Sequence, residues 1–269
     1  MVNKDTKLAE VPDYGLDAPK VVRNFFVIAA VGLLLGGSRA VGLWPGLLVI
    51  PLAGINLVFP LWSMGLTGGA ICGFLGGWMV YESKVGKLRL RERLLDQIAW
   101  TGGEQVLDVG CGRGLMLIGA AKRLLTGKAT GIDIWQAEDL TNNHADAVRQ
   151  NARREGVADR LEVKTADMRR MPFPDASFDV VVSRAAIHNL YQAAERAEAV
   201  GEIARVLKPG GVVLIDDIRH RREYTAILSE RGCTEIRRLD SRIISGFLAI
   251  LTLGSVQPMT LLGRKRSSV

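Results

Sequence analysis

The sequence is poor in cysteine and in aromatic residues, and each scarcity excludes a class of protein. The three cysteines, Cys72, Cys111 and Cys233, form no Cys-x-x-Cys pair and no even framework. That count excludes a disulfide-stapled scaffold, and the spacing predicts no metal site. Aromatic residues make up 6% of the chain, and no basic stretch is studded with them. A base-stacking platform is therefore absent, and we expect no nucleic acid partner.

Charge is missing from one long stretch. Between Phe25 and Tyr81 the one formal charge is Arg39, in a run dominated by Leu, Val, Ile, Gly and Ala, whereas the rest of the chain is charged at an ordinary globular density. A helix that crosses a bilayer needs about 20 apolar residues. The stretch is therefore long enough for two generous spans or three tight ones.

Basic residues on both sides of this stretch favour two spans. Lys20 and Arg23 precede it, and five cations follow it closely, Lys84, Lys87, Arg89, Arg91 and Arg93. Basic flanks stay on the cytoplasmic side of a membrane, so both ends of the stretch are expected there and the number of crossings is even. A cleaved signal peptide fits poorly, because the first apolar run starts late and a second one follows it.

These features predict a helical hairpin over residues 21–82. Its first helix is expected from near residue 21 to the low forties and its second from about 58 to 81, with Pro45, Pro51 and Pro60 in the turn region. Arg39, near the far end of the first span, is expected to reach the headgroups.

Glycines recur at helical spacing along the second predicted span. Small residues let two helices approach closely. Packing inside the hairpin is the simpler use of this stripe, and a homodimer built on it is left open. The stripe consists of Gly65, Gly68, Gly69, Gly73, Gly76 and Gly77.

A hydrophobic strand that runs into alternating glycines is the most informative motif. Residues 106–114 read VLDVGCGRG, so Asp108 lies near the strand end and three glycines follow it. Glycine lets the backbone approach a ligand, and the next helix presents unpaired N–H groups. The dinucleotide-binding pattern places its last glycine where this chain has Leu115. The loop therefore predicts a different nucleotide-type cofactor.

The glycine loop and four motifs that follow it in order along the chain resemble class I S-adenosylmethionine-dependent methyltransferases. The glycine loop is followed after about twenty residues by a strand ending in Asp133. Then come TADM at 165–168, FDVVVS at 178–183 and RVLKPGGVVLI at 205–215. The resemblance implies S-adenosylmethionine as the cofactor.

The resemblance also assigns roles to single residues. Asp133 is expected to accept the ribose hydroxyls and Asp167 to receive the adenine amino group, with Ile134 and Met168 flanking the ring. Cys111 lies in the loop but is expected to act as a small filler rather than as a reactive thiol. The full set of expected cofactor contacts is Asp108, Gly110, Cys111, Gly112, Gly114, Asp133, Ile134, Asp167, Met168 and Ser183.

Strands alternate with helices through the second half of the chain. This alternation predicts an α/β fold with a Rossmann-like, seven-stranded sheet, helices on both faces and the ligand at the carboxyl ends of the strands. The last two strands resemble the family's closing antiparallel pair. Strands are expected at 105–109, 129–133, 161–165, 178–183, 212–216, 234–239 and 259–263, and helices at 114–125, 141–155, 192–207 and from 220 to about 231.

Four regions follow from these patterns. Residues 1–20 form an N-terminal cytoplasmic segment, 21–82 the membrane hairpin, 83–103 an amphipathic connecting helix and 104–269 the methyltransferase domain. Residues 243–253 are too apolar for an exposed connection and too short to span. They are expected to dip into the membrane interface near the substrate entrance, or else to pack on the core as a strand or helix.

Methyl transfer needs alignment of the two reactants and, where the acceptor carries a proton, a base. In this fold the residues after the fourth strand, here 183–191, face the methyl group. His188 is the candidate base, and Tyr191 is a second catalytic candidate; Asp216 and Asp217 rank below them. The alternative role for His188 is a local hydrogen bond that holds the loop.

The sequence therefore predicts a multi-pass membrane protein with its catalytic domain on the cytoplasmic face. It would methylate a small, lipophilic or membrane-resident acceptor, because a soluble substrate needs no anchor. Three alternatives stay open: a protein or soluble acceptor, a non-catalytic cofactor-binding or scaffold protein, and transfer of another part of the same cofactor.

Overall fold

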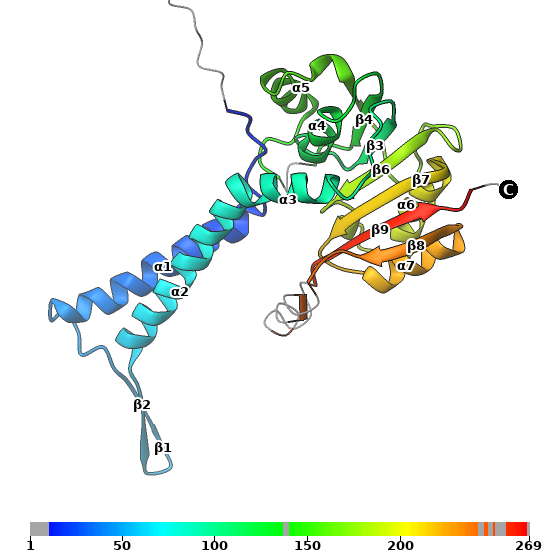
Figure 1. The fold of residues 1–269 in the computed structure, drawn as a ribbon. Coiled ribbons are helices and arrows are strands. Elements are labelled where there is room, and N and C mark those ends of the chain that lie inside the picture. The colour runs from blue at the N-terminus through cyan, green and yellow to red at the C-terminus, as the bar shows by residue number, and fades with distance from the viewer. Residues whose placement is uncertain (1–10, 137–139, 242–244, 247–249, 251–256, 268–269) are drawn as a thin grey trace, which may run out of the picture. The chain divides into compact units, whose positions relative to one another are not determined.

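The chain forms two compact units in the computed structural model, which describes residues 11–136, 140–241, 245–246, 250 and 257–267 (Figure 1). The hairpin unit comprises residues 15–87 and 137–141. The α/β unit comprises residues 1–14, 88–136 and 142–269. The α/β unit is thus interrupted along the chain by the hairpin unit.

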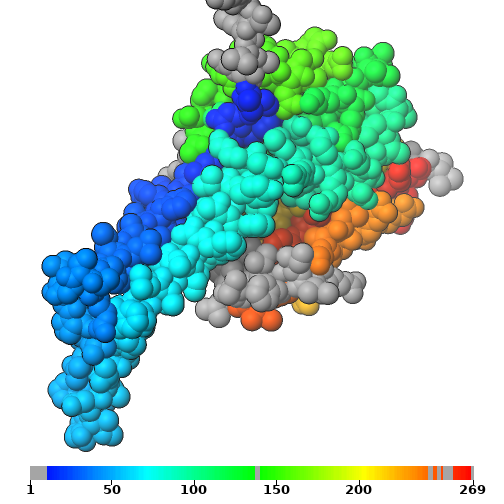
Figure 2. All heavy atoms as spheres, turned by 60° about the vertical axis from the view of Figure 1, so that its left-hand side comes forward, coloured from blue at the N-terminus to red at the C-terminus, as the bar shows by residue number. Residues whose placement is uncertain are grey.

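Two apolar helices make up most of the hairpin unit, α1 (Pro19–Ala40) and α2 (Leu61–Tyr81). They lie side by side (Figures 1 and 2). Glycines form their contact: a Cβ atom added to Gly32 would lie 2.4 Å from the Gly65 carbonyl oxygen and 3.0 Å from the Gly69 Cα. The predicted glycine stripe is thus used in part for packing inside the hairpin.

The connection between the helices corrects the predicted turn region. Instead of an irregular turn, β1 (Leu48–Leu52) and β2 (Ile55–Phe59) pair as an antiparallel hairpin, and α2 begins at Leu61 rather than near residue 58. Ala53 and Gly54 both have positive φ angles, 50° and 86°, as a two-residue type I′ turn requires. Pro51 is tolerated in β1 because this two-stranded ribbon consists of edge strands.

Arg39 lies in the last turn of α1. Its guanidinium donates to the Pro45 carbonyl and lies 4.9 Å from the centroid of the Trp62 ring. The lone charge of the apolar stretch therefore has a carbonyl and an aromatic face inside the hairpin unit.

The α/β unit contains a seven-stranded mixed sheet in the order β5-β4-β3-β6-β7-β9-β8. The first five strands in this order are parallel, and β9 runs antiparallel to both β7 and β8, as the predicted closing pair requires. The strands are β3 (Gln105–Val109), β4 (Lys128–Asp133), β5 (Leu161–Thr165), β6 (Phe178–Arg184), β7 (Leu207–Asp217), β8 (Cys233–Arg238) and β9 (Met259–Lys265).

Helices cover both faces of this sheet. On one face, α3, α4 and α5 pack through residues such as Leu95 and Leu117 against Val182; on the other, α6 and α7 pack through Ile203 and Tyr224. Both faces of the central strands are buried, which leaves their carboxyl ends as the place for a site. The helices are α3 (Lys87–Leu95), α4 (Leu115–Ala121), α5 (Ala145–Arg154), α6 (Ala193–Val206) and α7 (Arg221–Glu230), with short 3-10 turns at Ala158–Arg160 and Ile187–Asn189.

Several predicted boundaries shift. The amphipathic helix expected at 83–103 is the shorter α3, preceded by a π-helical turn at Glu82–Gly86. The helix expected at 114–125 ends at Ala121. The turn expected before residue 212 falls inside β7, where Gly210 has a φ of 79°. Residues 243–253, expected at the membrane interface, lie outside the described residues except for 245, 246 and 250.

Candidate active site

The loop after β3 is a backbone cradle that only glycine can form. Gly110, Gly112 and Gly114 have φ angles of 71°, 52° and 86°, which side-chain-bearing residues rarely adopt. A Cβ atom at Gly110 would lie 2.3 Å from the Cβ of Ala186, and one at Gly114 would lie 2.8 Å from Val148 Cγ1. The loop packs closely, and α4 begins directly after it with its N–H groups toward the loop.

Asp108 is buried beneath this loop, with 1% of its surface exposed. One of its carboxylate oxygens accepts a hydrogen bond of 2.8 Å from the Leu117 backbone N–H. Burial raises the pKa of Asp108 to about 7, and the Asp133 charge adds to the rise, while the Leu117 N–H and the Arg184 guanidinium oppose it. Asp108 therefore titrates near neutral pH.

Asp133 ends β4 and faces the same loop. Its Oδ2 accepts from the Gly112 N–H at 2.8 Å, and its Oδ1 accepts from the Trp135 N–H at 2.6 Å. The amide of Asn143 donates to Oδ1 at 3.5 Å. The predicted ribose residue is thus brought directly to the glycine loop.

Two buried polar atoms at this edge of the sheet have no hydrogen-bond partner among the described residues, Asn143 Oδ1 and Arg184 Nε. The Asn143 amide nitrogen also donates to the Gln136 carbonyl at 3.0 Å, which fixes the amide with its oxygen turned away. Arg184 Nε lies 3.3 Å from an Asp216 oxygen without hydrogen-bond geometry. Buried polar atoms are nearly always hydrogen-bonded, so these two fit a polar ligand.

Asp167 and Met168 follow β5. The Arg169 guanidinium binds both carboxylate oxygens of Asp167 at 2.7 to 3.1 Å and so lowers the pKa of Asp167. Arg169 also pairs with Glu195. Met168 reaches the glycine loop, where its Cε lies 3.5 Å from the position of a Cβ on Gly110. Ile134, the other residue predicted to flank adenine, is 47% exposed.

Cys111 and Ser183 occupy structural positions in the described part of the chain. Burial raises the pKa of the Cys111 thiol well above its usual value, so the thiol stays protonated. The Ser183 hydroxyl is buried and donates to the Val109 carbonyl at 2.8 Å. That bond ties the end of β6 to the end of β3.

His188 and Asp217 form a hydrogen-bonded pair at the carboxyl ends of β6 and β7. The Asp217 carboxylate lies 2.5 Å from His188 Nδ1 and accepts from the His188 backbone N–H at 3.1 Å. The buried Tyr224 hydroxyl donates to Asp217 at 3.4 Å. Burial raises the pKa of Tyr224, which keeps that hydroxyl a donor. A carboxylate on Nδ1 holds the imidazole with Nε2 free to accept a proton.

The other two catalytic candidates lie elsewhere. The Tyr191 side chain is 92% exposed, and its backbone carbonyl accepts from Arg196. Asp216 points to the opposite face of the sheet from Asp217, where it pairs with Arg184 and accepts from the Thr260 hydroxyl at 2.6 Å. The structure thus brings Asp217, rather than Tyr191, to His188.

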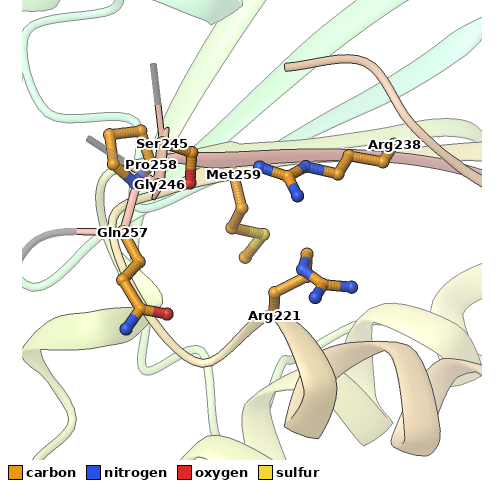
Figure 3. A pocket seen from close by; sticks show the side chains of 7 residues that line it. All are labelled: Arg221, Arg238, Ser245, Gly246, Gln257, Pro258 and Met259. Carbon is orange, nitrogen blue, oxygen red and sulfur yellow. The ribbon is translucent and has the colours of Figure 1, made fainter. Parts of the chain in front are cut away.

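A cavity of about 220 Å³ lies at the start of β9 (Figure 3). Met259, in its wall, is the cross-strand partner of Asp217. The guanidinium groups of Arg221 and Arg238 border the same space (Figure 3). Arg238 is paired with Asp240.

The match to a known family runs from β3 into β7. Residues 107–215 match a family model described as a methyltransferase domain. The chain is 33% identical over 172 residues to a 27-O-demethylrifamycin SV methyltransferase of Amycolatopsis mediterranei, covering 63% of this chain and 56% of that protein. It is 36% identical over 185 residues to a sterol 24-C-methyltransferase of Gibberella zeae, covering 64% of this chain and 45% of that protein.

A solved structure shares the fold. Geranyl diphosphate C-methyltransferase from Streptomyces coelicolor, crystallised with S-adenosyl-L-homocysteine, superposes with a TM-score of 0.52 at 18% identity, covering 66% of this chain and 75% of that one. The chain spans about half the length of the curated relatives that it matches. Residues 107–215 of the α/β unit are thus a methyltransferase domain, and the unit has the fold of class I methyltransferases. The domain is of the S-adenosylmethionine-dependent type, with S-adenosylmethionine as its cofactor.

Sequence reasoning did not single out Asn143 and Arg184, and it ranked Asp217 below His188 and Tyr191. Asn143 lies in an irregular loop with no motif, and Arg184 is one of many arginines. Asp216 and Asp217 are adjacent acids, and only the register of β7 decides which of them faces His188.

Proposed function

We propose that the protein is a membrane-anchored methyltransferase that methylates a small lipophilic or membrane-resident molecule. The observation that carries this proposal is the outward apolar surface of the hairpin unit. Leu34, Phe74 and Ile71 are 73%, 69% and 59% exposed. Both helices are long and apolar enough to cross a membrane. A soluble protein would bury such side chains, whereas lipid accepts them.

The basic flanks set the proposed orientation. Lys20 and Arg23 precede the first span, and Lys84 and Lys87 follow the second, so both helix ends that lead to the α/β unit face the cytoplasm. The β1–β2 ribbon then lies on the opposite side of the membrane. This orientation keeps the methyltransferase domain in the cytoplasm, where S-adenosylmethionine is available.

S-adenosylmethionine, when bound, supplies a methyl group on a positively charged sulfur. Asp133 and the Asn143 side-chain oxygen would accept the ribose hydroxyls, since Asp133 is hydrogen-bonded to the glycine loop and Asn143 to Asp133. Asp108 and Arg184 lie at the same edge of the sheet. The Asp108 carboxylate would bind the ammonium group of the methionine part, and the Arg184 guanidinium would bind its carboxylate. The glycine loop lets the backbone approach this group without steric conflict.

His188 is the proposed base. Asp217 accepts a hydrogen bond from the Nδ1–H group, so Nε2 carries a lone pair that takes a proton from an acceptor O–H or N–H group. The cavity beside Met259 is the proposed acceptor pocket, since Met259 lies opposite Asp217 in the sheet. Two relatives are named for a sterol and for 27-O-demethylrifamycin SV, which supports a lipophilic acceptor here.

Labelled methyl transfer tests the proposal. Membranes containing the protein are incubated with methyl-labelled S-adenosylmethionine, and label is followed into the total lipid extract, with Asp133→Ala as the inactive control. Label that requires Asp133 supports a lipid acceptor. Label absent from lipid but present in protein or soluble products refutes it. The anchor is tested separately by alkaline carbonate extraction, where release into the supernatant argues against spans.

A further inference from the structure

The residues just ahead of the hairpin unit are bound to the cofactor loop. Arg113, inside the glycine loop, is only 8% exposed. Its Nε donates to the Asp13 carbonyl at 2.8 Å, and its terminal nitrogens donate to the Asp13 carboxylate at 2.9 Å and to the Asn142 carbonyl at 3.1 Å. One guanidinium therefore joins the loop to residue 13 and to the segment that carries Asn143.

Asn151 on α5 completes this contact. Its side chain is buried, with 1% exposed. It accepts from the Asp13 N–H at 2.9 Å and donates to the Asp13 carbonyl at 2.8 Å and to the Arg113 carbonyl at 3.1 Å. Both backbone polar groups of Asp13 are thus held by one amide, as a neighbouring strand would hold them.

The next residue anchors the segment in the core. Tyr14 is 5% exposed, and its hydroxyl donates to Glu155 while accepting from Arg91 at 3.1 Å. The Arg91 guanidinium lies 5.6 Å from the centroid of the Tyr14 ring. Asp13 and Tyr14 are therefore held within the α/β unit, although the hairpin unit separates them from the rest of it along the chain.

We propose that Asp13 and Tyr14 are a working part of the cofactor site and that Arg113 is the positioning residue through which they act. A loop with three glycines has many accessible conformations, and the one seen here is fixed by hydrogen bonds from its backbone to Ile132 and Asp133 and leaves room for close approach of the cofactor. The Asp13 and Asn151 contacts hold Arg113, and Arg113 holds the loop. The site is thus assembled from chain segments on both sides of the hairpin, and the inference rests on the proposed function.

The test is the affinity of the full-length protein, reconstituted in lipid nanodiscs, for S-adenosylhomocysteine by calorimetry. Arg113→Met removes the guanidinium at similar length, and Asp13→Asn removes the carboxylate charge while keeping the backbone contacts. If only a fraction of the molecules holds the loop in its binding conformation, the apparent Kd is the intrinsic Kd divided by that fraction. We expect the Kd to rise about tenfold for Arg113→Met and by less for Asp13→Asn. The variant with both changes should bind no more weakly than Arg113→Met alone.

Arg149→Met, which breaks an exposed Arg149–Asp146 pair on α5, is the matched control and should bind normally.

Binding kinetics separate positioning from mere stabilisation. Loss of a preformed loop lowers the association rate constant more than it raises the dissociation rate constant, which stopped-flow measurements resolve. An unchanged Kd in a folded Arg113→Met variant overturns the inference, even if its melting temperature falls. Failure of the unaltered protein to bind S-adenosylhomocysteine would instead refute the proposed function.

Discussion

The carboxylate of Asp217 holds His188 at two points, at ring atom Nδ1, 2.5 Å away, and at the backbone N–H, 3.1 Å away. Because Asp217 is buried, this carboxylate fixes both the tautomer and the rotation of the imidazole. The contact at Nδ1 suits a catalytic base, and the contact at the backbone N–H holds the loop that carries His188. The rate of methyl transfer distinguishes the two roles.

Asp217→Asn should lower the rate of methyl transfer about a hundredfold, because an amide no longer stabilises the Nδ1–H tautomer or a positive imidazole. Affinity for S-adenosylhomocysteine should be unchanged. Asp179→Asn makes the same chemical change at the other end of β6, where Asp179 pairs with Lys208, and should leave the rate intact. A normal rate of methyl transfer in Asp217→Asn would mean that this pair only holds the loop in place.

Asp108 should make ligand-free stability fall as pH rises. Its pKa is about 7 in the folded protein and near 4 unfolded, so between these values the folded state binds more protons and its free energy of unfolding decreases. Asp108→Asn removes this penalty and should raise the melting temperature at pH 8 but not at pH 4. An equal shift at both pH values, measured by differential scanning calorimetry, would contradict the assignment.

The same titration should govern cofactor affinity. An ionised Asp108 attracts the cofactor ammonium, so binding of S-adenosylhomocysteine should strengthen as pH rises through about 7. Asp108→Asn should bind more weakly and lose this pH dependence. Calorimetry between pH 5.5 and pH 8 checks both, and an unchanged pH profile in the variant would place the titrating group elsewhere.

Asn143→Ala should weaken S-adenosylhomocysteine binding about tenfold, the effect of one lost buried hydrogen bond. We expect a deoxy analogue, which lacks the ribose hydroxyl that donates to Asn143, to bind Asn143→Ala as tightly as S-adenosylhomocysteine does. A double-mutant cycle over protein and ligand measures this. Gln136→Ala is the control, since Gln136 contacts Asn143 only through its carbonyl among the described contacts. Full additivity of the two losses would refute the ribose contact.

Gly32→Ala should destabilise the hairpin unit by about 1–3 kcal/mol, because the new methyl would lie 2.4 Å from the Gly65 carbonyl oxygen and the helices must move apart. Gly37→Ala in the same helix has no atom within 4 Å of the new methyl and should be neutral or slightly stabilising. Thermal unfolding in detergent compares the two. Equal melting temperatures would show that the glycine contact is not needed.

The local pattern of the sequence was enough to predict the class of fold. Strands alternate with helices from residue 105 to about residue 239, and the glycine loop, Asp133 and Asp167 each lie at the end of a predicted strand or just after one. Asp108 and Asp133 were found in this way because parallel strands bring their carboxyl ends to one edge. The ribbon at residues 48–59 was not predicted, because Pro45, Pro51 and Pro60 marked this stretch as the turn region.

What the sequence by itself determined is therefore the α/β domain, its cofactor loop and the apolar stretch. Only the tertiary structure decided which side chains meet: Asp13 with Arg113, 100 residues apart, His188 with Asp217, 29 residues apart, and Asn143 with Asp133. Periodicity records which face of an element is buried, because that depends on neighbours within a few residues. Contacts between distant polar side chains depend on strand register and loop path, which the packing of the whole domain sets.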